Sequence, residues 1–115
     1  MSIRVGESGK PIRYHTQIKM TSFTQLKLVF TAPAGGTTFT VTNASSPAVS
    51  LGPKVTDEEI GALNLDEYME YTFQTSDFDA AGTWKVQGTY TNTNADPDDV
   101  FIGPNVEFTV LAATA

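Results

Sequence analysis

Hydrophobic and polar residues alternate along several short segments of the chain, a pattern typical of strands that bury one face. The clearest is 25–31, where Leu26, Leu28 and Phe30 occupy every second position. Proline and glycines in 32–36 form a turn before 38–42 alternates again, so these segments predict a hairpin. Similar alternation marks further segments at 11–17, 49–51, 68–74, 84–90 and 106–110.

Together these segments predict an all-β fold, an immunoglobulin-like antiparallel β-sandwich of about seven strands with one short helical turn. The helical turn is expected at 57–63. Thr56 and Glu59 match the capping-box pattern that begins a helix, and Gly61 would end it early.

The length of 115 residues allows one domain. We expect residues 1–10 to form a flexible N-terminal arm, 11–111 the sandwich and 112–115 a featureless tail. Ile3, Arg4 and Val5 would let the arm add a strand to a neighbouring sheet edge and so make assembly contacts. The alternative is that the arm is a first strand folded back on its own sheet.

Charge is distributed unevenly along the chain. The formal net charge of −6 argues against nucleic acid as a partner. Residues 1–42 carry five bases and one acid, and 43–115 carry two bases and twelve acids. This asymmetry fits either a solvated acidic surface or a basic N-terminal part that docks on an acidic neighbour, another copy included. The chain shows neither a secretory signal nor an apolar run of membrane-spanning length, so we expect cytoplasmic synthesis and no membrane partner.

The chemistry-bearing residues do not form a recognised catalytic or metal-binding motif. His15 is the only histidine and there is no cysteine, so we expect no enzyme, no metal site and no cofactor. Asp96, Asp98 and Asp99 are the best candidates for calcium, but they lack the EF-hand spacing, and a solvated loop is the favoured interpretation. The Asn43 glycosylation sequon is expected to be idle without a secretory signal.

Most aromatic residues fall on the predicted inward side of their strands, which indicates a core rather than a carbohydrate-binding face. They are Tyr14, Phe30, Phe39, Tyr71, Phe73, Trp84, Tyr90 and Phe108. Tyr68 and Phe101 fall off this pattern, and are candidates for a sugar platform or a protein interface.

The segment Phe78–Trp84 resembles the corner between strands E and F of immunoglobulin-like domains. Asp79, Gly82 and Trp84 match the corner positions, with tryptophan where tyrosine is usual and one extra residue in the spacing. The resemblance implies that Trp84 is a buried anchor whose N–H reaches a backbone carbonyl.

A second resemblance covers nearly the whole chain. Its segments are 9–13, 26–33 with Gly35 and Gly36, 55–57, 68–73, 81–84 and 108–110. In this order and spacing they resemble small immunoglobulin-like structural proteins of tailed bacteriophages: capsid decorations, head fibres, and tail or baseplate accessories. The resemblance implies a virion component without catalysis, whose partners are other virion proteins or copies of itself. The alternative is a host-surface or glycan-binding module on a phage tail or fibre.

Overall fold

The computed structural model describes residues 3–113, and in these residues the predicted all-β class is confirmed. They contain eleven strands, rather than about seven, and one 3₁₀ turn, η1 (Pro33–Gly35). The strands are β1 (Ile3–Arg4), β2 (Pro11–His15), β3 (Gln25–Thr31), β4 (Thr38–Thr42), β5 (Ser50–Leu51), β6 (Val55–Asp57), β7 (Gly61–Leu63), β8 (Tyr68–Thr72), β9 (Gly82–Asn92), β10 (Asp99–Ile102) and β11 (Val106–Leu111).

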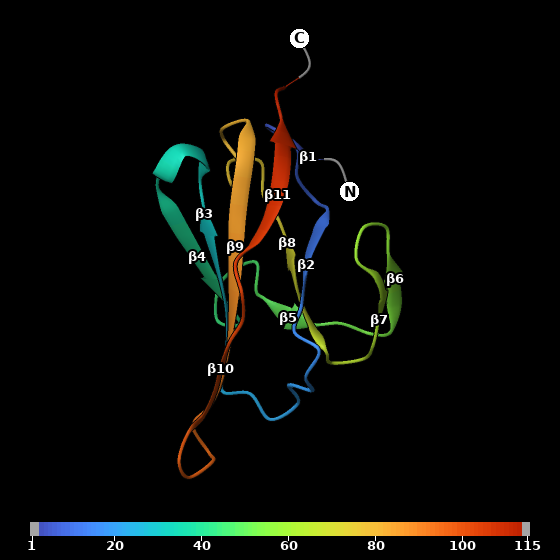
Figure 1. The fold of residues 1–115 in the computed structure, drawn as a ribbon, viewed down its shortest axis with the longest axis vertical. Coiled ribbons are helices and arrows are strands. Elements are labelled where there is room, and N and C mark those ends of the chain that lie inside the picture. Colours follow the sequence, from blue (N-terminus) through green and yellow to red (C-terminus); the bar gives the residue numbers. More distant parts are fainter. Residues whose placement is uncertain (1–2, 114–115) are drawn as a thin grey trace.

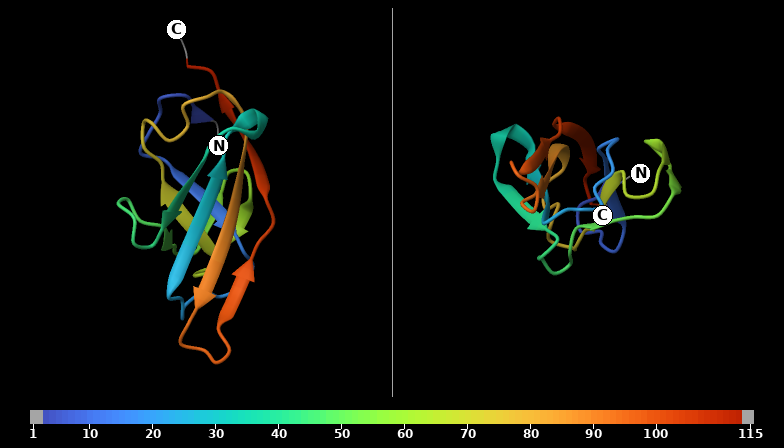
Figure 2. Two further views of the ribbon diagram at one scale, coloured as in Figure 1. Left: turned by 90° about the vertical axis from the view of Figure 1, so that its left-hand side faces the viewer. Right: turned by 90° about the horizontal axis from the view of Figure 1, so that it is seen from below.

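Two sheets face each other across the middle of the molecule (Figures 1 and 2). The larger has the order β1-β11-β9-β3-β4, with β10 also paired to β9, and the smaller has the order β2-β8-β5. The eleven-residue β9 organises the larger sheet, because β3 pairs along one side of it and β10 and β11 share the other. The pairing of β1 with β11 is parallel, so this sheet is mixed.

A bulge separates β10 from β11 on their shared side of β9. Ile102 pairs with Thr89 and Val106 pairs with Val86, so the three residues 103–105 face only two residues of β9. Such a mismatch bends the strand and raises its local twist. It divides one long edge into two short ones.

Tyr14 of the smaller sheet crosses to this bulge and ends there. Its hydroxyl donates a hydrogen bond to the carbonyl of Pro104 at 2.6 Å. A Cβ at Gly88 would lie 2.6 Å from the tyrosine ring, and a Cβ at Gly103 would collide with the hydroxyl. The two glycines therefore leave the space that Tyr14 fills.

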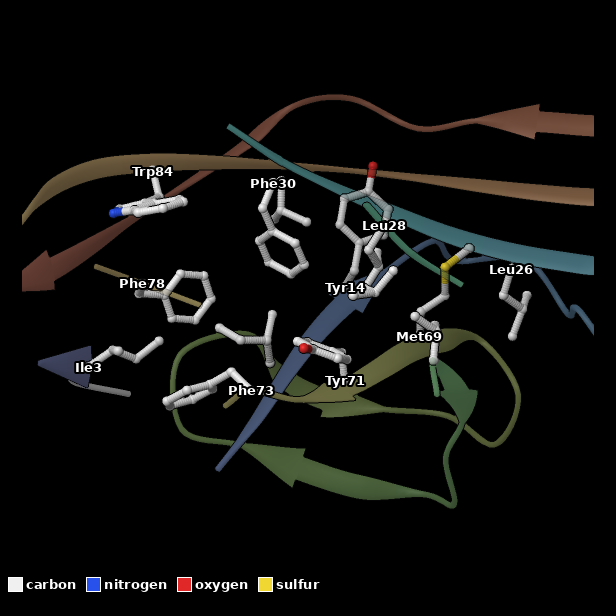
Figure 3. Packing of buried hydrophobic residues seen from close by; sticks show 14 of the residues in the cluster. Ile3, Tyr14, Leu26, Leu28, Phe30, Met69, Tyr71, Phe73, Phe78 and Trp84 are labelled. Atoms are coloured by element: carbon white, nitrogen blue, oxygen red, sulfur yellow. The ribbon is translucent and has the colours of Figure 1, made fainter. Parts of the chain in front are cut away.

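The inner core, which we define as the buried hydrophobic side chains between the two sheets, follows the predicted alternation (Figure 3). Phe78 lies at its aromatic centre, with ring centroids 5.2 Å from Phe73, 5.2 Å from Trp84 and 5.3 Å from Phe108. Trp84 is 2% exposed, and its Nε1–H donates to the carbonyl of Ala80 at 2.9 Å. Both expectations for Trp84 are confirmed.

The two other residues that match the corner positions, Gly82 and Asp79, differ in their surroundings. Gly82 has φ +134°, and a Cβ there would lie 2.9 Å from Pro33. Asp79 is exposed and does not anchor the corner. Asp77 has that role, because its Oδ2 accepts hydrogen bonds from the Tyr71 hydroxyl at 2.6 Å and from the backbone N–H of Gln74 at 2.8 Å.

The predicted helical turn at 57–63 is wrong, since this segment is the β6–β7 hairpin. The side chain that caps the turn belongs to Asp57, not Thr56. Its Oδ1 accepts the N–H groups of Glu59 at 2.9 Å and Ile60 at 3.1 Å. Gly61 then turns the chain back with φ +93°, a conformation that favours glycine, so a strand follows in place of a helix.

The β6–β7 hairpin lies beside β2 and β8, on the side away from β9 (Figure 1). Leu63 and Tyr68 are both 0% exposed, and we call this pair the outer cluster. Tyr68 donates to the carbonyl of Pro53 at 2.6 Å, and its neighbour Met69 points to the inner core. The strand β8 is therefore buried on both faces where it begins, at Tyr68 and Met69, and Tyr68 is not the exposed residue that the sequence predicts.

The segment expected to be an arm is tied to the larger sheet from Ile3 onward. Ile3 pairs with Val110 and is 2% exposed, and the Val5 N–H donates to Leu111 at 2.9 Å. This arrangement corresponds to the alternative, a first strand folded back on its own sheet. Removing the segment would take a buried side chain out of the inner core.

Candidate functional site

The strand β10 has an open edge, because β9 is its one partner among the described residues. The N–H of Gly103 donates to the carbonyl of Gly88 at 2.9 Å, which fixes the phase of this antiparallel ladder. Since hydrogen-bonded and non-hydrogen-bonded pairs alternate, Phe101 directs its backbone groups toward β9. The N–H and C=O groups of Val100 and Ile102 point away, toward the open edge.

The same two residues also expose apolar side chains. Val100 is 51% exposed and Ile102 is 65% exposed, on the outer face of the larger sheet. Their pairing partners on β9 are Thr91 and Thr89, which are polar but uncharged. We call Val100 and Ile102, with their outward backbone groups, the β10 edge. A strand from another chain can pair with such an edge, because its backbone can bond to the outward N–H and C=O groups and its side chains can pack against the apolar ones.

A groove lies between β2, β11 and the tip of the β6–β7 hairpin. Its apolar lining includes Ile3, Ile60, Val106 and Phe108, and its volume is about 90 Å³. Sites for small organic ligands usually measure about 300–1,000 Å³. This groove therefore has the size for one side chain of a neighbouring molecule and not for a typical ligand.

Arg13 forms the polar wall of the groove and is already engaged. Its Nε lies 2.9 Å from Glu70 and its Nη1 lies 3.1 Å from Asp57. Burial alone would lower the pKa of Arg13, but the hydrogen bonds and charges of the two carboxylates outweigh burial and raise that pKa. The pair with Asp57 joins the β6–β7 hairpin to β2, the pair with Glu70 joins β2 to β8, and together they leave Arg13 little capacity for an external anion.

The predicted assembly residues are not brought together into one surface. Ile3 is buried, Val5 is half-buried against the inner core, and Arg4 is exposed with its Nη1 donating to Ala112 at 3.2 Å. Phe101 lies at the other end of β9, half-buried against the inner core. With Tyr68 in the outer cluster, neither of the two aromatic candidates forms a sugar platform.

Sequence reasoning misses the β10 edge because 92–99 has the composition of a loop and the next clear alternation begins at 106. The signal is the run Val100-Phe101-Ile102, three apolar residues between an acidic loop and Gly103-Pro104. A run of three has no clear period, so it predicts neither a strand nor which side chains are outward.

The described residues hold no group of three or more histidine, cysteine, aspartate or glutamate side chains that could bind a metal ion. The acidic loop before β10 instead begins with a local turn, in which Asn92 accepts the N–H of Asn94 at 3.0 Å. Within residues 3–113, no helix is long and apolar enough to cross a membrane.

Comparison with protein families, with characterised proteins and with solved structures finds no match for this chain.

Proposed function

We propose that this chain is a non-enzymatic structural component of a bacteriophage virion, a capsid decoration or a tail, neck or baseplate accessory, which acts through protein–protein contacts. The observation that carries the proposal is the β10 edge, where exposed apolar side chains and outward backbone groups coincide. Such an edge is a liability in an isolated domain and is useful where another chain covers it. The resemblance to small phage structural proteins supplies the virion context.

We further propose that the fold is an immunoglobulin-like sandwich, and the strand order supports this. Immunoglobulin constant-type domains place strands A, B, E and D in one sheet and C, F and G in the other, and variable-type domains add C′ beside C. The order β2-β8-β5 corresponds to B-E-D, and β11-β9-β3-β4 corresponds to G-F-C-C′. The first strand β1 would then be strand A moved to the edge of strand G.

The polar contacts within the structure also favour a structural role. Arg13 and Asp57 tie the hairpin to the smaller sheet, and Asp77 fixes the corner through Tyr71. The pKa of Tyr71 lies well above its usual value, mainly because the residue is buried and also because its hydroxyl is hydrogen-bonded to the charged Asp77. The hydroxyl therefore keeps its proton and donates it in this hydrogen bond. These groups hold segments of the chain in place.

The proposal is tested on particles of the phage that encodes the chain. Quantitative mass spectrometry of purified virions should find the protein at a fixed, high copy number relative to the major capsid or tail protein. A few copies located at a tail tip would support the receptor-binding alternative instead. Absence of the chain from washed particles, while it accumulates in the infected cell, would contradict both.

A further inference from the structure

We propose that the groove between β2, β11 and the tip of the β6–β7 hairpin receives a basic side chain, a lysine or an arginine, from an extended segment of another protein. The inference rests on the proposed function, because it describes a partner in protein–protein assembly. Three features of the groove carry it: its position at an open strand edge, its exposed apolar walls and the excess of carboxylates around it.

The groove lies at the open edge of β2. Among the described strands, β2 pairs with β8 alone. Ile12 points to the inner core, Arg13 meets Asp57 of the hairpin on the opposite face of β2, and both residues of β2 line the groove. A groove that is bordered from both faces of a strand lies beside the edge of that strand. The groove therefore follows β2 on the side away from β8.

The backbone of β2 directs hydrogen-bonding groups toward the same edge. The N–H of Phe73 donates to the carbonyl of Lys10 at 3.1 Å. Further along, the N–H of Thr16 donates to the carbonyl of Glu67 at 3.1 Å. Even-numbered residues of this segment thus face β8, and alternation turns the N–H and C=O groups of Arg13 toward the open edge. An extended partner can pair with β2 there while one of its side chains enters the groove.

The walls of the groove leave apolar surface exposed. Ile60 is 42% exposed and Val106 is 45% exposed, although both are large hydrophobic residues. Together with Phe108 they line a volume of about 90 Å³, which suits one side chain. The methylene stem of a lysine or an arginine can cover this surface while its charged end stays near water.

Carboxylates outnumber cations around the groove. Four carboxylates and two cations line the groove or pair with residues that line it: Asp57, Glu59, Glu70 and Glu107, with Arg13 and Lys85. Arg13 is held by two of the carboxylates, and Lys85 is the strand partner of Glu107, so an excess of two negative charges remains. A positive end group is therefore favoured over a neutral or an acidic one.

Binding of short peptides to the full chain tests this chemistry. The peptides have blocked ends and threonine and glycine flanks, and they differ only in the central residue. It is lysine, arginine, glutamate or norleucine, which keeps an apolar stem without the charge. Titrations are followed through the backbone amide signals in the ¹H–¹⁵N NMR spectrum.

The basic peptides should bind weakly, because one side chain and a few backbone hydrogen bonds make the contact. We expect the lysine and arginine peptides to shift the amide signals of Arg13, Ile60 and Val106 with dissociation constants of about 1 mM. The norleucine peptide should bind at least about threefold more weakly, since it lacks the ion pair. The glutamate peptide should give no saturable shift.

Neighbouring residues provide matched controls. Glu59→Gln should weaken the lysine peptide about twofold to threefold without affecting the norleucine peptide, whereas Glu58→Gln changes an exposed acid outside the lining and should have little effect. Ile60→Ala should weaken both peptides, and Leu65→Ala, at an exposed side chain outside the groove, should weaken neither. Far-UV circular dichroism checks that each variant is folded, and the peptide series on the parent chain tests the proposal without any variant.

Several outcomes overturn the proposal. A norleucine peptide that binds as tightly as the lysine peptide means that the groove selects an apolar side chain. Equal losses for Glu58→Gln and Glu59→Gln mean that the peptides respond to the overall charge of the surface. Shifts confined to the β10 edge, or no saturable shift from any peptide, remove the groove as a binding site. Groove signals that move with the concentration of the chain itself assign the groove to a second copy in place of another protein.

The groove and the virion role can fail separately. Failed binding by a chain that is abundant in virions refutes the groove alone. Selective binding of basic peptides by a chain that is absent from virions refutes the virion role alone.

Discussion

The inner core and the outer cluster differ in how they relate to the alternation of the sequence. The inner core takes every second residue from strands whose other face is at least partly exposed to solvent, such as β3 and β9. The outer cluster exists because the β6–β7 hairpin covers the second face of the smaller sheet, so adjacent Tyr68 and Met69 are both buried. Alternation identifies a core only where the protein leaves one face of a strand uncovered.

The largest effect should come from the inner core. Trp84→Ala removes a 2% exposed side chain that contacts Phe78 and hydrogen-bonds Ala80, so we expect a loss of about 3–5 kcal/mol in the free energy of unfolding. Chemical denaturation measures it. A nearly unchanged midpoint would show that this corner does not anchor the core.

In the outer cluster, Leu63→Ala should cost less, about 2–3 kcal/mol, because a hairpin can relax toward the smaller side chain more easily than two sheets can. Hydrogen exchange sharpens the comparison: the variant should lose protection chiefly in β6 and β7, and Trp84→Ala should lose it throughout. Equal loss throughout for both variants would mean that the two clusters unfold as one unit.

The corner offers a matched pair of aspartates. Asp77→Ala leaves the buried hydroxyl of Tyr71 and the N–H of Gln74 without their acceptor, so it should cost about 1–3 kcal/mol. Asp79→Ala changes an exposed residue and should stay within about 0.5 kcal/mol. Thermal denaturation of both variants checks this, and a reversed order would show that Asp79, and not Asp77, stabilises the corner.

The smallest effect concerns a single hydroxyl in the outer cluster. Tyr68→Phe removes the hydrogen bond to Pro53 and should cost about 0.5–1.5 kcal/mol at neutral pH. Burial, followed by the charge of Glu70, raises the pKa of Tyr68 above its unfolded value. The stabilisation from the neutral phenol is thus complete below about pH 10 and declines as the pH rises toward the folded pKa.

Denaturation at a series of alkaline pH values distinguishes Tyr68 from the buried tyrosines of the inner core. The pKa values of Tyr14 and Tyr71 are also raised, chiefly by burial. The Phe variant should therefore lose less stability than the parent above about pH 10, while keeping part of the decline. A decline identical to that of the parent would mean that Tyr68 does not contribute to it.

How much the sequence could predict follows from the same comparison. Alternation located β3, β4, β8, β9 and β11, the inward aromatic residues and the burial of Trp84. Alternation failed at 57–63, where an aspartate caps a hairpin turn much as it would cap a helix. It also failed at Tyr68, because the burial of this residue depends on a hairpin that covers it only after the chain has folded. The β10 edge could not be predicted, because the side chains that point outward are known only from the register of β10 with β9. That register depends on how the strands pair and not on the local sequence.

The side chain of Tyr14 also couples three positions in evolution. Its hydroxyl ends at the bulge beside Pro104, and its ring occupies the space that side chains at Gly88 and Gly103 would need. A substitution at either glycine would place a side chain in the space that Tyr14 occupies. A substitution of Tyr14 by a smaller residue would leave a void between the two sheets. Relatives of this protein should therefore carry the tyrosine and both glycines together or have exchanged all three, so that this trio would serve as a signature for recognising distant relatives by sequence.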